Sequence, residues 1–312
     1  MFRLRRKQFA EDPEAQERNG GKSLNKLKTG SIYNKGVCFF CTFVTIKFIR
    51  VKIIEVVNAL EKFAPLPLQE GYDNAGLQVG LTDAEVSRAL LCLDVTEAVV
   101  DEALSRGCNL IISHHPLIFH KLAHISDENY VQRTVMKAIR QEVTIVAMHT
   151  NLDSAPGGVN FKIAEKLGLQ DVTFFGDEKR ADEVLGGEGV IGSLPEETAA
   201  DDFILMLKRR FDVECVQANQ LLRRPIRRVA LCGGAGSFLL EAAIRAGADA
   251  FVTGEMHYHE YFGHGQQIQI AVIGHYQSEQ FTNEIFQSII AEACPSVECF
   301  LSQVNTNPII YL

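Results

Sequence analysis

Leu110-Ile111-Ile112-Ser113-His114-His115-Pro116 is the stretch of this sequence that decides its fold class. Its three consecutive apolar residues predict a buried strand, and two histidines follow where that strand ends. Polar side chains at the carboxyl end of a buried strand are typical of binding sites in α/β proteins. Neighbouring residues on an extended backbone point to opposite sides, so each imidazole could bind a different metal ion. Taken alone, the same pair could also belong to a surface loop.

Two further apolar runs end in a histidine that is followed, four residues later, by a carboxylate. His149 and Asp153 follow the first of these runs. His275 and Glu279 follow the second. Imidazole and carboxylate groups together suit zinc, manganese or iron(II). Because three strand ends carry the residue types of metal ligands, we expect them to form one shared metal centre.

Charge separates the first fifty residues from the remainder of this 312-residue chain, which is long enough for one large domain or two ordinary ones. Residues 1–50 hold 11 basic and 4 acidic residues, whereas the remainder holds 20 basic and 35 acidic residues. The acidic body argues against general nucleic-acid binding, which needs a basic surface. No stretch reaches the roughly 18 uninterrupted apolar residues that a membrane span needs.

The leader at residues 1–50 is expected to be disordered or not native to the protein, and an upstream mis-assigned initiation codon is the preferred explanation. A signal peptide is disfavoured, because the basic part is too long and no small-residue cleavage site follows. The eight cysteines show no framework spacing, which favours a reducing compartment such as the cytoplasm. Cys38 and Cys41 have the C-x-x-C form, but no second pair or nearby histidine completes a site.

From Val51 onward, apolar runs alternate with amphipathic segments. Strands are expected at residues 77–79, 89–93, 110–113, 144–148, 229–232, 250–253, 271–274 and 297–301. Helices are expected at residues 53–63, 97–105, 130–141, 159–167, 200–211, 238–246 and 280–292. This alternation predicts an α/β protein with largely parallel sheets and covering helices. The weakest segment, residues 177–188, is expected to be the loop between two halves.

The two halves resemble each other at an offset of 140 residues. Leu91-Cys92, for example, recurs as Leu231-Cys232. A diverged duplication fits this pattern, with an N-terminal α/β lobe at residues 51–180 and a C-terminal α/β lobe at residues 181–312. The strand ends of both lobes would then form one site between them. Generic α/β patterning is the alternative explanation.

Several motifs also appear in a fixed order along the chain. They are Asp73-Asn74-Ala75-Gly76-Leu77, Ser113-His114-His115-Pro116, His149-Thr150-Asn151-Leu152-Asp153 with Gly157-Gly158-Val159-Asn160, Thr253-Gly254-Glu255, and Gly274-His275-Tyr276-x-x-Glu279. Each motif is short, but the ordered set is highly specific. It resembles the GTP cyclohydrolase 1 type 2 homologue family, also called Nif-three-like. The resemblance covers residues 51–312, which together would form one Nif-three-like unit.

The resemblance implies two α/β lobes with a dinuclear metal site, in the short form that lacks the domain inserted in some members. Its motifs imply that the metal ligands are His114, His115, Asp153, His275 and Glu279. Two divalent metal ions would bind per chain, and zinc, manganese and iron all stay open. The resemblance also implies a toroidal homohexamer. Five ligands cannot fill two metal shells, so Asp153 or Glu279 would bridge the ions and solvent would complete them.

His149 lies four residues before Asp153 but is not among the ligands that the resemblance implies. It would either orient a ligand or act as a general acid or base, which makes it the candidate catalytic residue. Asp73 and Asn74 would hold their turn through side-chain-to-backbone bonds, or contact a substrate. Gly157-Gly158 precedes a predicted helix and could receive an anion, although glycine pairs are common there.

Glu255, His257 and His259 lie at the strand end that matches His114 and His115 in the other half. They would line the pocket or form an ordinary polar loop. The other histidines have no cluster of similar residues around them in the sequence. We expect them at the surface: His120, His124 and His264.

The family name implies a metal-dependent hydrolase that opens the guanine ring of GTP and releases formate. Hydrolysis of a phosphoester or another nucleotide-like small molecule is the simpler variant, and the same pair of ions suits either reaction. No GxxxxGK[ST] loop is present, so a nucleotide would be held differently from P-loop enzymes. The non-enzymatic alternatives are metal storage or delivery and a ring-shaped binding scaffold. Whether the protein is an enzyme therefore stays open at this point.

Overall fold

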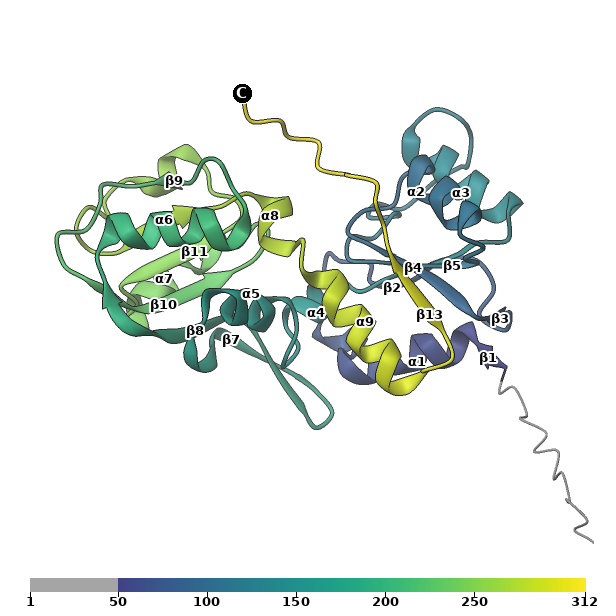
Figure 1. Cartoon of the computed structure of the whole chain (residues 1–312), viewed down its shortest axis with the longest axis horizontal. Helices are drawn as coiled ribbons and strands as arrows, with labels where there is room; N and C mark the ends of the chain where they lie inside the picture. The colour runs from purple at the N-terminus through teal and green to yellow at the C-terminus, as the bar shows by residue number, and fades with distance from the viewer. Residues whose placement is uncertain (1–49) are drawn as a thin grey trace, which may run out of the picture. The chain divides into compact units, whose positions relative to one another are not determined.

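The computed structural model describes residues 50–312, which contain two main sheets and their covering helices (Figure 1). The expectations for the leader and for Cys38 and Cys41 lie outside these described residues. None of the helices in the described part combines the length and the apolar character that a membrane crossing requires. The alternation of apolar runs and amphipathic segments thus does produce a mixed α/β protein, as the sequence predicts.

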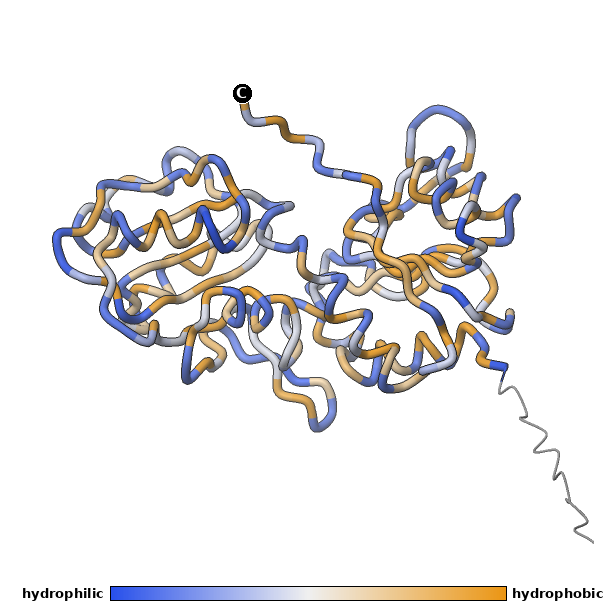
Figure 2. Tube along the Cα trace, in the orientation of Figure 1, coloured by the Kyte–Doolittle hydropathy of each residue, from blue (hydrophilic) through white to orange (hydrophobic). Residues whose placement is uncertain are grey.

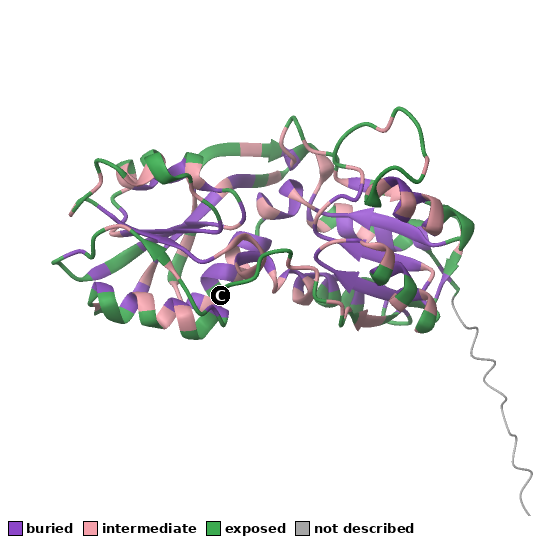
Figure 3. Ribbon diagram, turned by 90° about the horizontal axis from the view of Figure 1, so that it is seen from above, coloured by how far each residue is buried: buried purple, intermediate pink, exposed green. Residues whose placement is uncertain are grey.

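The first sheet has five strands in the order β13-β4-β5-β6-β2. Four of them are parallel neighbours: β13 (Glu298–Leu301), β4 (Arg88–Cys92), β5 (Leu110–Ser113) and β6 (Thr144–Ala147). The edge strand β2 (Gly76–Val79) is antiparallel to β6. Every residue of β5 and β6 is buried (Figure 3), which explains why both strands appear in the sequence as unbroken apolar runs.

Helices cover both faces of this sheet. Helices α2 (Glu97–Ser105) and α3 (Tyr130–Arg140) pack together against β4, β5 and β6, and helices α1 (Ile53–Phe63) and α9 (Thr282–Ala293) pack together on the other side. Helix α9 and strand β13 come from the end of the chain, so residues on both sides of the expected boundary at residue 180 build this sheet. A small two-stranded sheet pairs β1 (Val51–Lys52) with β3 (Glu85–Val86).

The second sheet is mixed rather than largely parallel. Its six strands follow the order β7-β8-β10-β11-β12-β9. They are β7 (Gln170–Ala181), β8 (Val184–Thr198), β10 (Ile226–Cys232), β11 (Ala250–Thr253), β12 (Gln269–Val272) and β9 (Gln217–Ala218). Only β10, β11 and β12 are parallel to one another. The prediction of a largely parallel sheet is therefore wrong for the outer strands of this sheet, which pair antiparallel.

The prediction of a loop between two halves at residues 177–188 is wrong. Strands β7 and β8 form a long antiparallel hairpin here, with Ala181 paired with Val184 at its end. The sequence did not indicate this hairpin, because its strands contain several glycines, which have low strand propensity. They are required by close contacts: a Cβ atom at Gly187 would lie 2.8 Å from the Phe174 ring, and one at Gly186 would lie 2.4 Å from the carbonyl oxygen of Ser154.

One apolar core extends across both sheets. Alternate residues such as Leu91 and Ile112 of the first sheet, and Leu231 and Val252 of the second, belong to this single cluster. Helix α5 (Val159–Leu167) connects the two parts of the core, since it packs against β8 and β10 as well as α9. The tube in Figure 2 shows the same strands as hydrophobic segments between more hydrophilic loops. The opposite faces of the two sheets have separate apolar clusters.

The parallel strands of the two sheets share one pattern. Strand β4 pairs with β5 so that Ala89 is opposite Leu110, and β10 pairs with β11 so that Val229 is opposite Ala250. Both pairs of positions differ by the offset of 140 residues seen in the sequence. In each sheet a helix connects the two strands, α2 in the first and α7 (Leu240–Arg245) in the second.

We expect Gly158→Ala to destabilise the protein. A Cβ atom at Gly158 would lie 1.8 Å from the carbonyl oxygen of Leu152, so the backbone before α5 must move. Overpacking of this kind costs about 1–3 kcal/mol or more. Chemical denaturation should show this loss for Gly158→Ala but not for Gly71→Ala, since a Cβ atom at Gly71 meets nothing within 4 Å. Equal stability of the two variants would contradict the prediction.

Candidate metal centre

The predicted site residues lie at strand ends of both sheets. His114 and His115 follow β5 directly. His149 follows β6 and immediately precedes helix α4 (Thr150–Asp153), whose last residue is Asp153. Helix α8 (His275–Glu279) follows β12 in the second sheet and carries His275 and Glu279 one turn apart, on the same face.

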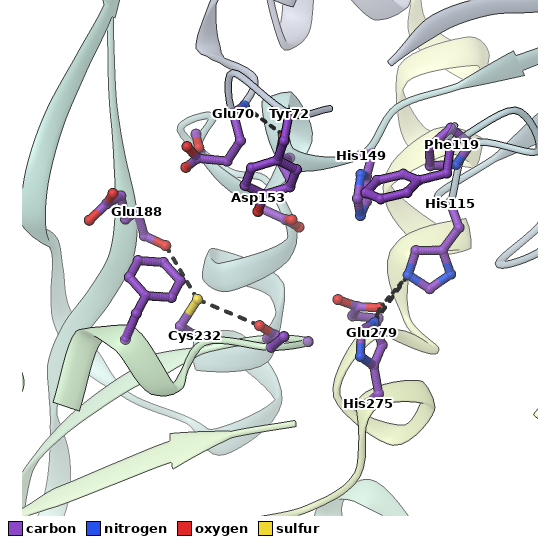
Figure 4. Close-up of a pocket in the computed structure, with 17 residues that line it drawn as sticks. Glu70, Tyr72, His115, Phe119, His149, Asp153, Glu188, Cys232, His275 and Glu279 are labelled. Atoms are coloured by element: carbon purple, nitrogen blue, oxygen red, sulfur yellow. Dashed lines mark hydrogen bonds and ion pairs between the residues drawn. The ribbon is translucent and has the colours of Figure 1, made fainter. Parts of the chain in front are cut away.

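The structure brings all five residues together, and we call them the metal centre: His114, His115, Asp153, His275 and Glu279. Figure 4 shows most of them around one cavity.

On one side of this centre, Glu279 Oε2 lies 3.0 Å from His115 Nε2 and 3.2 Å from His275 Nε2. On the other side, His114 Nε2 lies 3.6 Å from both Glu279 Oε1 and Asp153 Oδ1. The residues thus form two trios of possible metal ligands, in each of which the donor atoms lie within 4.8 Å of one another. Glu279 belongs to both trios.

Burial makes this arrangement costly without a cation. His114 is fully buried and Glu279 is 3% exposed. Within the described part of the chain, His114 Nε2, Asp153 Oδ1 and Glu279 Oε2 are buried and have no hydrogen-bond partner, although Glu279 Oε2 lies 3.0 Å from His115 Nε2. Buried polar atoms are normally satisfied. Imidazole nitrogens and carboxylate oxygens that converge in this way fit a divalent metal ion.

Each imidazole of the centre is oriented through its other ring nitrogen. His115 Nδ1 lies 2.7 Å from Asp94 Oδ1, and His275 Nδ1 lies 2.9 Å from Glu255 Oε1. His114 Nδ1 lies 2.9 Å from a backbone carbonyl oxygen. In all three residues, Nε2 is therefore directed into the cluster. Histidines that bind metals are commonly held in this way, with the second nitrogen on a carboxylate or carbonyl group.

His149 lies beside the metal centre. Its ring centroid is 5.3 Å from that of His114 and 5.4 Å from that of His115, and the three imidazoles form a further group that could hold a metal ion. Its Nδ1 lies 2.7 Å from Asp73 Oδ1. Asp73 also accepts hydrogen bonds from the amide and hydroxyl of Thr150. This geometry suits both interpretations of His149, as an orienting residue and as an acid or base.

Asp73 and Asn74 hold their turn, as expected from the sequence, since the Asn74 amide donates to Asp73 Oδ1 at 2.7 Å. Burial would raise the pKa of Asp73, but its bonds to His149 and Thr150 outweigh burial and lower it to about 2. Asp73 is therefore ionised at neutral pH and accepts a hydrogen bond from the Nδ1–H group of His149. The role of Asp73 in holding a histidine was not evident from its local sequence.

The carboxylates raise the pKa values of two imidazoles of the centre. Burial lowers the pKa of His115, but the neighbouring carboxylates of Asp94 and Glu279 outweigh this effect and raise it to about 10. Burial likewise opposes the effect of Glu279 on His275, whose pKa is raised to about 9. Burial also acts to raise the pKa of Glu279, yet the neighbouring imidazoles hold it well below its usual range. The ionised Glu279 therefore faces imidazoles that hold a proton. A metal ion can take the place of this proton.

A cavity of about 410 Å³ opens beside the metal centre. Aromatic side chains and carboxylates form its outer wall: Tyr72, Phe119, Phe238, Glu70 and Glu188. Within the described range, its lining contains no lysine or arginine. His257 lines a second cavity of about 340 Å³ together with Glu255, whereas His259 packs beside Tyr258 and Phe262 and lines neither cavity.

The other histidines do not join the cluster. His120 and His124 are exposed, and His124 Nε2 lies 2.9 Å from Glu128. His264 is partly exposed and near Gln267. This arrangement agrees with the surface positions expected from the sequence.

Two residues that shape the centre were not predicted from the sequence. Asp94, which orients His115, follows β4 as a polar residue at a strand end, the same signal that identified the histidines. Gly234 has φ +56°, and a Cβ atom there would lie 2.4 Å from Glu279 Oε1. Glycine is therefore required at this position, and the glycine-rich stretch after β10 was the available signal.

Metal binding should release protons. In the metal-free protein, the pKa values of His115 and His275 are raised to about 10 and about 9, so this pair of imidazoles holds a proton at neutral pH, which one Nε2 can donate to the other across 3.2 Å. A metal ion binds only the neutral imidazole, so we expect at least one proton to be released per chain near pH 7. Calorimetry of zinc binding in buffers of different ionisation enthalpy measures this number. It should fall, and the affinity should rise, as the pH approaches 10; zero release at neutral pH would contradict the prediction.

Comparisons with known proteins agree with this architecture. The family described as Duf34/NIF3 (NGG1p interacting factor 3) matches residues 51–308. A Clostridium perfringens protein named GTP cyclohydrolase 1 type 2 homolog is 32% identical over 230 residues, which cover 73% of this chain and 87% of that protein. A Lactococcus lactis protein of the same name is 31% identical over 265 residues, covering 83% of this chain and 98% of its own length.

Solved structures share the fold. The crystal structure of a Bacillus cereus protein related to NIF3 matches with a TM-score of 0.76 and 26% identity, over 84% of this chain and 99% of that one. A Staphylococcus aureus hypothetical protein matches with a TM-score of 0.76 and 27% identity, over 84% of this chain and all of its own. The family model, the curated relatives and these structures lead to one conclusion: this chain belongs to the Duf34/NIF3 family.

Proposed function

We propose that this protein binds two divalent metal ions and is a metal-dependent hydrolase of a small molecule. The observation that carries the proposal is the pair of ligand trios that share one buried carboxylate. His114 and Asp153 would hold one ion, His115 and His275 would hold the other, and Glu279 would bridge them. Zinc, manganese and iron all suit this mixture of imidazole and carboxylate ligands.

Glu279 is the better candidate for the bridge than Asp153. Its two carboxylate oxygens face different histidines, Oε1 towards His114 and Oε2 towards His115. Asp153 faces only His114 at a comparable distance. Three side chains per ion leave coordination positions for solvent and substrate, which is the usual difference between a catalytic and a structural metal site.

A pair of ions held by these residues would activate water and would stabilise the negative charge that develops during hydrolysis. The chain's own contribution is to place a proton-transfer group beside them. The ionised Asp73 accepts a hydrogen bond from the Nδ1–H group of His149. The other ring nitrogen, Nε2, is then free to accept or return a proton. His149 lines the same cavity as His275 and Glu279, so a substrate there would be within its reach.

The cavity suits a small molecule with a flat ring and an anionic end. Its volume of about 410 Å³ is within the range of small-molecule sites. Tyr72, Phe119 and Phe238 present partly exposed aromatic faces to it. Since no lysine or arginine lines the cavity in the described range, the metal ions would bind the anionic group. A nucleotide or another phosphoester fits this description, and ring opening of GTP is the variant suggested by the relatives' name.

Storage or delivery of metal, or a scaffold role, is the second candidate function, because the same ligands would bind metal without turnover. We further propose that the protein acts in the cytoplasm as a toroidal homohexamer without membrane or nucleic-acid partners. The net charge of −8 supports the last point. Shared strand register at an offset of 140 residues supports a duplication that produced the parallel strands of both sheets, although β13, from the end of the chain, joins the first sheet and β7 joins the second.

We expect the wild-type protein, loaded with zinc or manganese, to hold two metal ions per chain. Glu279→Ala should lose both, because Glu279 belongs to both trios, whereas His275→Ala should lose only one. Elemental analysis after dialysis measures the content of each variant. The exposed His124 is the matched control, and His124→Ala should retain both ions. Equal losses in Glu279→Ala and His275→Ala would contradict the shared carboxylate.

The metal-loaded protein should hydrolyse at least one member of a panel of phosphoesters and nucleotides. GTP is included, with formate measured as the product of ring opening. We expect His275→Ala to lower kcat/KM by at least about tenfold, the usual effect of disturbing a metal site. Tight binding of two ions with no turnover of any substrate by the wild type would instead favour storage or delivery.

A further inference from the structure

The C-terminal segment, residues 302–312, continues from the end of β13 (Figure 1). Its first residues are attached to the first sheet and its helices. The Ser302 amide donates to the carbonyl oxygen of Leu91 at 2.8 Å, and its hydroxyl donates to Glu102 at 2.6 Å. The Gln303 amide donates to the same carboxylate. The start of the segment therefore has a defined position.

Thr306 connects this segment to the metal centre through one carboxylate. Its hydroxyl donates to Asp94 Oδ2 at 2.6 Å. The other oxygen of the same carboxylate, Oδ1, lies 2.7 Å from His115 Nδ1. Asp94 thus uses one oxygen for the C-terminal segment and the other for a metal-centre imidazole. Fixing the first oxygen restricts rotation of the carboxylate, and this restriction fixes the plane of the His115 ring.

The segment also reaches the neighbourhood of the second imidazole in the same trio. Ile309 and Tyr311 line the second cavity together with Glu255 and His275. Glu255 is the carboxylate that holds His275 Nδ1. The C-terminal segment is thus close to both carboxylates that orient the His115 and His275 rings.

The other trio has no such connection. His114 is oriented by the backbone carbonyl of Met148, which directly follows strand β6 of the first sheet. Among the described residues, no hydrogen bond joins residues 302–312 to His114 or Asp153. The segment therefore has contacts that can affect one trio and leave the other unchanged.

We propose that Thr306 is a positioning residue for one of the two metal ions, the ion held by His115, His275 and Glu279. Through Asp94, the C-terminal segment sets the affinity of this position and not of the position formed by His114 and Asp153. The inference rests on the proposed dinuclear function. Loss of a residue that orients a metal ligand typically lowers metal affinity by about 10–100-fold.

The test uses the full-length protein titrated with zinc in competition with a chromophoric chelator. The wild type should bind two equivalents. Thr306→Val, which keeps the shape and removes the hydroxyl, should weaken one equivalent by about 10–100-fold and leave the other unchanged. Thr306→Ser keeps the hydroxyl and should restore wild-type affinity. Thr134→Val is the matched control, because the Thr134 hydroxyl donates within α3 at 2.7 Å and has no contact with the centre.

The absorption spectrum of bound cobalt(II) gives a second measurement, which a general destabilisation of the protein would not change. The bands of the weakened equivalent should change in Thr306→Val and return in Thr306→Ser, while the bands of the tighter equivalent stay the same.

Each outcome separates the two proposals. If Thr306→Val leaves the affinity of both zinc equivalents unchanged, or weakens both equally, the role of Thr306 is overturned. The dinuclear function is left intact by this result. Failure of Thr306→Ser to restore the affinity also overturns it, since the hydroxyl is the group that contacts Asp94. A wild type that binds fewer than two equivalents overturns the dinuclear function and this inference with it.

Discussion

Burial of the Glu279 carboxylate is the constraint on which the rest of the site depends. This side chain is 3% exposed and faces imidazoles that follow strands of both sheets. A buried carboxylate is costly unless cationic or hydrogen-bonding groups compensate for its lost hydration. His114 and His115 come from the first sheet and His275 from the second. The lost hydration of Glu279 is therefore fully compensated only when both sheets have folded and their shared apolar core has formed.

Backbone geometry supports this arrangement at close range. The short helices α4 and α8 turn the chain sharply after β6 and β12, which places Asp153 and Glu279 at neighbouring strand ends. Gly234 and Gly254 allow the loops of the second sheet to approach α8 where a Cβ atom would meet Glu279 Oε1 or the backbone of His275. The residues that orient the imidazoles come from still other elements. A small displacement of any of these elements would therefore change the distances between the donor atoms.

Sequence patterns predicted the elements that depend on neighbouring residues. The unbroken apolar run at residues 110–113 is a buried strand, and the histidines after it do meet Asp153 and Glu279. The hairpin at residues 170–198 was missed, because its glycines serve contacts with Phe174 and other groups rather than local propensity. The partners of Asp94 could not be predicted either. Thr306 lies 212 positions away from it, and no local pattern records such a contact.

The sequence by itself determined the α/β class, the residue types of the metal centre and the membership of the family, because periodicity and motifs are properties of consecutive residues. The tertiary structure alone decided that β13 joins the first sheet beside β4 and that Glu279, rather than Asp153, faces both sets of imidazoles. It also decided which carboxylate or carbonyl group orients each imidazole. These features depend on strand pairing, burial and hydrogen bonds between residues far apart in the chain, where the free energy is decided by the surroundings of a side chain and not by its neighbours in sequence.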